Sequence, residues 1–416
     1  MTLIKTSILS AIATIIRVIA GFVSVKIVAV YIGPSGLALV GQMQSFIGMM
    51  SSVASAGIGS GVVKYTAEHY EDESAKQKIW SSALKISLVL IVPMAVAIIF
   101  LAEFISLKLL HTREYSSVFI VFAVSLVFFV LNGLLSSILN GQKEIKRLTL
   151  LNIAGALFGL GVTIVLVVNY QLYGALVAGI VSQSIVFFIT LGFVLKSNWF
   201  KLSLFVGSLD KAYMKKLLKY SAMALTSAIS IPLSHMYLRD YIGTHIGWDE
   251  AGYWQAIWRI SETYLMLVTT TLSIYYLPKL SSLQDRSELK HELLHGYKII
   301  MPLVIVMALG IYLFRDVVIT LLFTPKFAPM AELFLYQLIG DVFKIASWLL
   351  GYIMVAKAMT RLFIVSELIF VLSFVLLSVV FMHLYGIIGM TIGFMVNYML
   401  YLGFLYFSLR GYLSGK

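Results

Sequence analysis

Twelve stretches of about 20 mostly apolar residues constrain this chain more than any other feature. As an α-helix, a stretch of that length crosses the roughly 30 Å hydrocarbon core of a bilayer. The composition is 60% hydrophobic and only 12% charged, whereas soluble domains are roughly 25% charged. We therefore predict an all-α polytopic membrane protein rather than a set of soluble domains. The spans are expected near residues 8–32, 37–62, 81–103, 117–139, 148–169, 174–195, 220–242, 252–277, 299–322, 331–355, 362–384 and 387–409.

The positive charge of the chain is distributed unevenly. Lys and Arg number 31 against 19 Asp and Glu, which gives a formal net charge of +12. If the N-terminus is cytoplasmic, the six opposite loops hold only Lys108, Arg113 and Lys326, and most other cations lie in cytoplasmic segments. Membrane proteins distribute Lys and Arg in this way, so the charge requires no nucleic-acid partner. Both termini are predicted to be cytoplasmic.

A weak internal repeat relates the two halves of the chain. Residues 101–112 align with 313–324, and Arg147 aligns with Arg361, at a shift of 212 to 216 positions. Six spans return each half to its starting side, so the halves have parallel orientations and are expected to enclose a central cavity. We predict an N-terminal six-helix lobe at 1–195, a cytoplasmic linker at 196–219 and a C-terminal six-helix lobe at 220–416.

Ionisable residues inside the predicted spans are the first candidates for function, because one such charge costs roughly 2.5–3.5 kcal/mol at mid-helix. The first span contains Arg17 and Lys26. Arg17 either faces the cavity or packs between helices, and Lys26 either faces the cavity or extends to the outer interface. The first half offers no mid-membrane acid to pair with them. A positive, hydrated cleft of this kind suits a substrate that carries phosphate.

In the second half, the polar residues lie at helical spacing. His235 and Arg239 are four residues apart beside Asp240, and Arg259 and Glu262 are three apart and able to pair. Polar residues on the tenth span recur on one face, and an Asp–Lys pair that locks two helices is the alternative to a binding role there. They are Gln337, Asp341, Lys344 and Trp348. Tyr253 and Trp254 are interpreted as anchors at the membrane interface.

Several classes of chemistry are excluded by what the sequence lacks. The chain has no cysteine, and it contains no Walker motif, H-E-x-x-H or nucleophile elbow. The glycine-rich run at 57–61 ends a span and is interpreted as a bend. We predict no enzyme activity, no cofactor and no bound metal. Transport would then be driven by a gradient, and the candidate coupling residues are His235, Asp240, Glu262 and Asp341.

Several segments resemble a known family of transporters, including residues 54–65 and 356–361. Residues 33–36, 248–255, 259–264, 273–281 and 337–344 are similar to those of O-antigen and lipid III flippases. These form the polysaccharide-transporter branch of the superfamily that includes multidrug and toxin extruders. The resemblance implies two six-helix lobes around a cationic cavity in the bacterial inner membrane. It also implies alternating access that moves an undecaprenyl-pyrophosphate-linked oligosaccharide to the periplasmic leaflet, with an O-antigen repeat unit favoured.

The resemblance also suggests roles and partners. Arg17, Lys26, Arg239 and Arg259 would hold the pyrophosphate, with Glu262, Asp341 and Lys344 nearby. Contacts with sugar or with the translocation path are assigned to Gln42, Gln44, Gln255, Trp258 and Asn132. Besides inner-membrane lipids, a glycan polymerase and a chain-length regulator are the expected partners.

Two rival functions remain open at this point. A cation-coupled multidrug exporter would share the fold, but it favours an acid-rich cavity, whereas the mid-membrane charges of the first half are basic. A membrane-embedded glycan polymerase or ligase would ordinarily carry a large outer loop with catalytic residues. The outer loops here are short.

Overall fold

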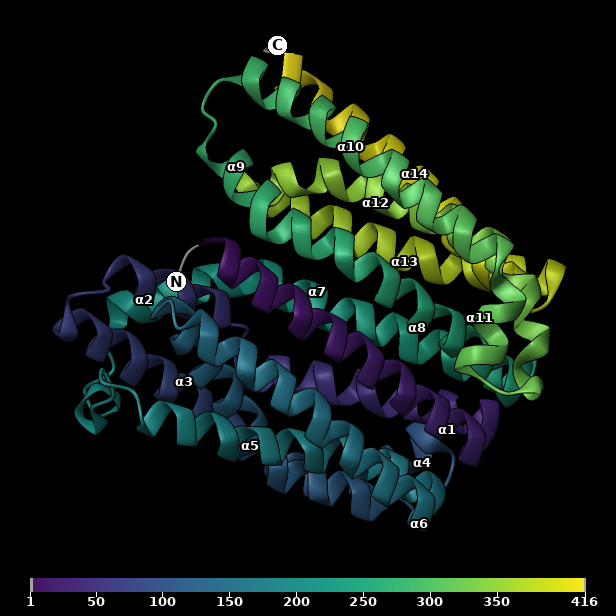
Figure 1. The fold of residues 1–416 in the computed structure, drawn as a ribbon, viewed down its shortest axis with the longest axis horizontal. Helices are drawn as coiled ribbons and strands as arrows, with labels where there is room; N and C mark the ends of the chain where they lie inside the picture. The colour runs from purple at the N-terminus through teal and green to yellow at the C-terminus, as the bar shows by residue number, and fades with distance from the viewer. Residues whose placement is uncertain (1–2, 415–416) are drawn as a thin grey trace. The chain divides into compact units, whose positions relative to one another are not determined.

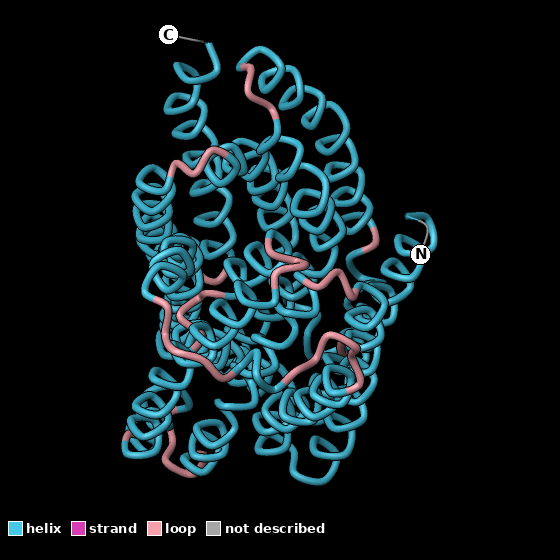
Figure 2. The backbone as a smooth tube through the Cα atoms, turned by 90° about the vertical axis from the view of Figure 1, so that its left-hand side faces the viewer, coloured by secondary structure: helices cyan, strands magenta, loops and turns pink. Residues whose placement is uncertain are grey.

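The computed structural model describes the backbone of residues 3–414, and the side chains of that range except at 3–11, 219, 220, 274 and 414. Within the described range the chain is almost entirely helical and contains no strand (Figures 1 and 2). The elements are α1 (Leu3–Ala54), α2 (Gly59–Glu68), α3 (Glu73–Phe100), α4 (Ala102–Leu110), α5 (Ser116–Gly141), α6 (Ile145–Leu195), the 3-10 helix η1 (Leu202–Phe205), α7 (Lys211–His245), α8 (Trp248–Thr271), the π-helix η2 (Leu272–Tyr276), α9 (Leu277–Ser282), α10 (Arg286–Leu313), α11 (Arg315–Leu322), the 3-10 helix η3 (Pro325–Leu333), α12 (Phe334–Ala356), α13 (Thr360–Tyr385) and α14 (Ile388–Ser414).

Two long helices each contain two predicted spans. The helical backbone of α1 is interrupted at Gly33 (φ 70°, ψ −167°), which is followed by Pro34. Glycine tolerates positive φ, and proline has no N–H to donate to the preceding turn. The backbone of α6 is interrupted at Gln171 (φ 47°, ψ −123°). These two breaks separate 8–32 from 37–62 and 148–169 from 174–195, as the hydropathy pattern predicts.

The twelve predicted spans can now be placed on the helices. Eight described helices are long and apolar enough to cross a membrane, and two of these are the interrupted α1 and α6. The remaining two spans fall on α7 and α8, whose polar residues lower their hydropathy. The protein is an all-α polytopic membrane protein.

Three predicted span limits are wrong because they cross a helix end. The second span was expected to reach residue 62, but α1 ends at Ala54 and a turn with positive φ at Ala56 and Gly57 leads into α2. The spans at 81–103 and 299–322 run past the ends of α3 and α10, into α4 and α11. Apolar residues continue across each break, so hydropathy alone does not reveal the change of direction.

The helices form two compact units, which we describe separately. Unit 1 comprises residues 1–32 and 39–233, and unit 2 comprises residues 33–38 and 234–416. Helix α7 is continuous across residue 233. The lobe limits at 195 and 220 stay a prediction.

In unit 1, the segment that precedes α7 packs on α3. The ring of Trp80 lies 5.4 Å from that of Trp199 and 5.5 Å from that of Phe205. Leu204 of η1 is buried in the same cluster. The sequence predicts this stretch as a polar linker, and the structure shows that much of it belongs to the core of unit 1.

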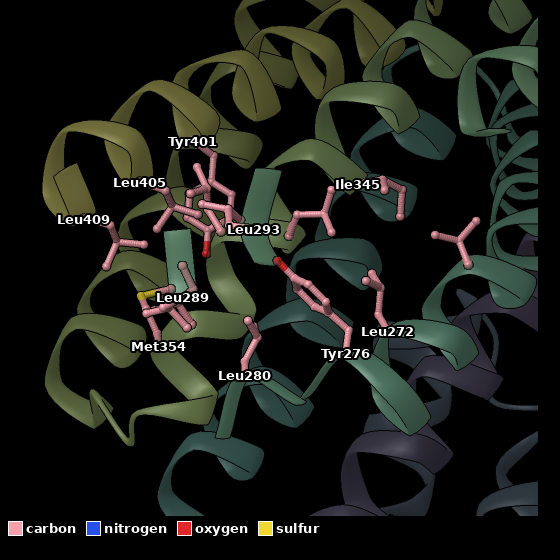
Figure 3. Close-up of a cluster of buried hydrophobic side chains, with 14 of the residues drawn as sticks. Leu272, Tyr276, Leu280, Leu289, Leu293, Ile345, Met354, Tyr401, Leu405 and Leu409 are labelled. Atoms are coloured by element: carbon pink, nitrogen blue, oxygen red, sulfur yellow. The ribbon is translucent and has the colours of Figure 1, made fainter. Parts of the chain in front are cut away.

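In unit 2, a large apolar cluster joins α8–α10 to α12 and α14. Leu289 and Leu293 of α10 point toward Met354, Leu405 and their neighbours (Figure 3). This cluster packs α12 against α14. The polar residues described next lie in the first half of α12.

Candidate functional site

Three polar side chains on one face of α12 are buried inside unit 2. Gln337 and Asp341 are fully buried, and Lys344 is 8% exposed. The hydroxyl of Tyr264 on α8 donates to Asp341 Oδ2 at 2.9 Å, and Gln337 Nε2 donates to Asp341 Oδ1 at 3.4 Å. These two donors hold the carboxylate in place.

Lys344 lies in an aromatic cage. Its Nζ is 4.8 Å from the ring centroid of Trp258, 5.1 Å from that of Trp348, and 5.9 Å from those of Phe394 and Tyr398. Among the ion pairs of the described residues, none joins Lys344 to Asp341 within 4 Å. The structure therefore does not contain the Asp–Lys lock that the sequence left open. Rings stabilise a desolvated ammonium by about 2 kcal/mol or more.

Helix α7 adds two buried basic residues, His235 and Arg239, to the same region. The ring of His235 is 4.3 Å from that of Trp258 and 5.6 Å from that of Trp254. The guanidinium of Arg239 lies 5.6 Å from the Trp254 ring. The prediction of Trp254 as an interface anchor is wrong, because this indole is 1% exposed and packs between these side chains.

One edge of α8 remains accessible. Arg259 and Glu262 approach to 3.8 Å, as the spacing predicts, with side chains 40% and 49% exposed. Gln255 and Trp258 share this helical face and are largely buried. An Arg–Glu pair this exposed contributes little to stability, so both groups are available to a ligand.

Several buried polar atoms around this edge have no hydrogen-bond partner. They are Gln255 Oε1 and Trp254 Nε1 of α8 and Gln337 Oε1 of α12. Buried polar groups are nearly always satisfied by protein, water or ligand. This set therefore points to water or ligand at the α8–α12 region.

The other predicted site residues lie on separate elements, most of them in unit 1. Arg17 is exposed and Lys26 is half-buried, and both lie on α1 before its break. Gln42 is buried and Gln44 is exposed after the break. Asn132 of α5 is half-buried and accepts a hydrogen bond from Thr190 Oγ1 of α6 at 2.7 Å. In unit 2, Asp240 is half-buried on α7. The proposed roles of these residues stay predictions.

Sequence reasoning missed Tyr264, Phe394 and Tyr398. The last two are four residues apart on α14, with rings 4.9 Å from one another. An aromatic pair at helical spacing was visible in the sequence, but only the packing of α14 on α12 shows that it surrounds a lysine.

Comparison with known proteins agrees with this architecture. A profile of the family "Polysaccharide biosynthesis protein" matches residues 27–332. The chain is 30% identical, over 408 residues, to the lipid III flippases of Escherichia coli (strain K12) and Shigella flexneri, with 96% of each chain covered. It belongs to the polysaccharide biosynthesis protein family.

Solved structures show the fold of this family member. A multidrug resistance MATE family transporter of the MOP superfamily superposes with a TM-score of 0.82, at 16% identity and 98% coverage of both chains. The lipid II flippase MurJ gives a TM-score of 0.75 at 17% identity, covering 98% of this chain and 87% of MurJ. The fold is therefore that of MOP-superfamily transporters.

Proposed function

We propose that this chain is a flippase that moves a lipid-linked oligosaccharide from the cytoplasmic to the periplasmic leaflet of the bacterial inner membrane. The observation that carries this function is the 30% identity, across 96% of both chains, to proteins named lipid III flippases. The site supports it, since the α8 edge combines the accessible Arg259 with Trp258 and with Gln255, whose amide oxygen has no hydrogen-bond partner. Arginine holds phosphate by paired donors, and amides and aromatic rings suit sugars.

Within this function we assign roles to the predicted residues. Arg17, Lys26, Arg239 and Arg259 hold the diphosphate, while Gln42, Gln44, Gln255, Trp258 and Asn132 contact sugar or the path. Coupling to a gradient uses His235, Asp240, Glu262 or Asp341. We take an undecaprenyl-pyrophosphate-linked O-antigen repeat unit as the cargo, with both termini cytoplasmic. A glycan polymerase and a chain-length regulator are proposed as partners.

Deletion of the gene tests the function. We expect lipid-linked repeat units to accumulate in the cytoplasmic leaflet and surface polymer to be lost. Unpolymerised units in the outer leaflet would instead indicate a polymerase, and normal glycan with drug hypersensitivity would indicate an exporter. Loss of lipid III export with intact O-antigen would assign the other cargo.

A pair of arginine variants tests the diphosphate contact. Arg17→Ala should reduce surface glycan at unchanged expression, because it removes an exposed guanidinium on a membrane helix. Arg113→Ala is the matched control, because that arginine lies in a loop where its distance from Glu103 is 3.9 Å and both are largely exposed. Equal surface glycan in the two variants would remove Arg17 from the site.

A further inference from the structure

Helices α3 and α10 are structural counterparts in the two units. Each has 28 residues, an internal proline (Pro93 or Pro302), and a short helix that follows one residue later. Each begins after an aspartate whose carboxylate accepts a hydrogen bond from the backbone N–H three residues on, at 3.0 Å for Asp72 and 3.2 Å for Asp285. These caps align the two helices at a shift of 213 residues.

The pattern of burial confirms this alignment. Four inward positions of α3 are buried, and their counterparts on α10 are buried too. The pairs are Lys76 and Leu289, Trp80 and Leu293, Ala83 and Gly296, and Ile91 and Val304. The two helices therefore present the same face to their own units, and the neighbouring sides can be compared position by position.

In unit 1 the neighbouring side of α3, which carries Glu73, Gln77, Ser81 and Lys85, is covered by the segment before α7. Gln77 Nε2 donates to the carbonyl oxygens of Ser203 and Val206, both at 2.9 Å. Two turns further on, Lys85 Nζ donates to the carbonyl oxygen of Gly207. Side-chain donors of α3 thus bind the backbone of an irregular chain segment.

Charge and close packing complete this covered face. Lys201 Nζ lies 2.7 Å from Glu73 Oε1. Ser81 is fully buried, and a Cβ added at Gly207 would lie 3.1 Å from its Oγ. The segment is therefore held on α3 by one acid, Glu73, and by two side-chain donors, Gln77 and Lys85.

The same positions of α10 are exposed. Glu73, Gln77, Ser81 and Lys85 correspond to Arg286, Lys290, Leu294 and Lys298. We call these four residues the α10 face. All four are exposed. On α3 the outer two positions are exposed as well, so the contrast lies at the middle two: Gln77 is half-buried and Ser81 is buried, whereas Leu294 is 59% exposed.

The charge of the α10 face is positive at each polar position. Lys290 and Lys298 keep donors where α3 has Gln77 and Lys85, whereas Arg286 replaces an acid and rests on the ring of Tyr412 at 5.1 Å. The two acids of this segment lie on another side of the helix, where they line a cavity of about 370 Å³ with Lys279 and His291. They are Glu288 and Glu292.

We propose that the α10 face docks an irregular, acidic segment of a partner protein. In unit 1 the corresponding face binds a segment through its carbonyl groups and one lysine. With arginine in place of Glu73, the complementary residue is an aspartate or glutamate. Leu294 supplies the apolar contact. This surface is independent of which lipid-linked glycan is moved.

Cysteine accessibility tests this docking, because the natural chain has no cysteine. A Leu294→Cys variant is labelled with N-ethylmaleimide, which crosses membranes, in native membranes and in proteoliposomes of purified protein and extracted host lipid. We expect labelling to be at least about tenfold slower in native membranes, because reaction requires access to the thiol. Lys290→Glu with Lys298→Glu should restore the proteoliposome rate. Leu202→Cys, at a side chain that is 69% exposed, should react equally in both preparations.

Each other outcome overturns the proposal. Slow labelling in both preparations indicates that lipid covers the face, and fast labelling in both indicates that nothing does. If labelling in native membranes stays slow after charge reversal, the bound molecule does not depend on the two lysines. If the charge-reversed chain fails to fold, as judged by size-exclusion chromatography of the detergent-solubilised protein, Lys290→Gln with Lys298→Gln replaces it in the same comparison.

Discussion

Helices α12 and α14 pack closely at Gly340, so Gly340→Ala is an informative single change. An added Cβ would lie 2.4 Å from Phe394 Cδ1 and 3.2 Å from Met395 Cα. Carbon atoms in contact ordinarily lie about 3.5–4.0 Å apart. The Phe394 ring is 1% exposed and packs 5.4 Å from the ring of Trp258, so it has no free space to turn into. The two helices must therefore separate by about 1 Å to restore that contact distance.

The expected cost follows from this separation. A radial gap of about 0.5–1 Å removes a quarter to a half of each dispersion contact, and overpacked cores lose about 1–3 kcal/mol. Alanine returns up to about 1 kcal/mol of helix propensity. We expect a net loss of about 1–2 kcal/mol in the free energy of unfolding. Because Phe394 also forms part of the Lys344 cage, glycan export should fall as well.

Gly351→Ala on the same helix is the matched control. The nearest atoms to its added Cβ lie at 3.9 Å, which is ordinary contact. In thermal unfolding of the detergent-solubilised protein, followed by size-exclusion chromatography, Gly340→Ala should melt below the parent and Gly351→Ala at or above it. Equal melting of the two variants would refute the close packing of α12 on α14.

Three further changes have equally definite outcomes. Lys344→Met should keep or raise the melting temperature, since an apolar replacement of a buried charge is often neutral or stabilising, yet it should reduce surface glycan if the ammonium serves transport. Arg147→Ala removes hydrogen bonds to Glu144 and Ser197 and should lower stability by about 1–3 kcal/mol, measured by thermal unfolding. The hydroxyl of Ser287 and the backbone amides of Glu288, Ser287 and Arg286 hold the pKa of Asp285 below its ordinary value. Its contribution to stability is therefore present above about pH 4 and is lost as the pH falls through the lowered pKa. The melting difference between Asp285→Ala and the parent should shrink accordingly.

The sequence predicted the helical architecture well because membrane insertion depends on local hydropathy. The breaks at Gly33 and Gln171 fall between predicted spans. The limits of the spans at 81–103 and 299–322 were missed, because apolar residues such as Phe100 and Phe314 continue through each helix end. Hydropathy measures transfer to lipid, whereas a helix end is a backbone property.

The candidate site was only partly visible for a different physical reason. Helical spacing placed Gln337, Asp341 and Lys344 on one face of α12 and paired Arg259 with Glu262. Spacing along one helix says nothing about the helix opposite. The partner of the lysine proved to be a set of rings, several of them from other helices, instead of the acid three residues away.

The polar segment before α7 shows how the internal repeat can correct a sequence interpretation. Composition favoured a linker there, because residues 196–219 contain six lysines. Yet Leu204 is buried while Leu202 is 69% exposed. Composition counts the two leucines alike and therefore cannot show this difference. The counterpart helix in unit 2 shows what α3 would look like without this segment: Leu294 is exposed where Ser81 is buried. The exposed leucine on α10 lies between Lys290 and Lys298, at the position that the segment covers on α3. Helices α3 and α10 therefore share the positions that pack into their own units and differ in what covers the neighbouring side. This difference becomes visible when one unit is compared with the other.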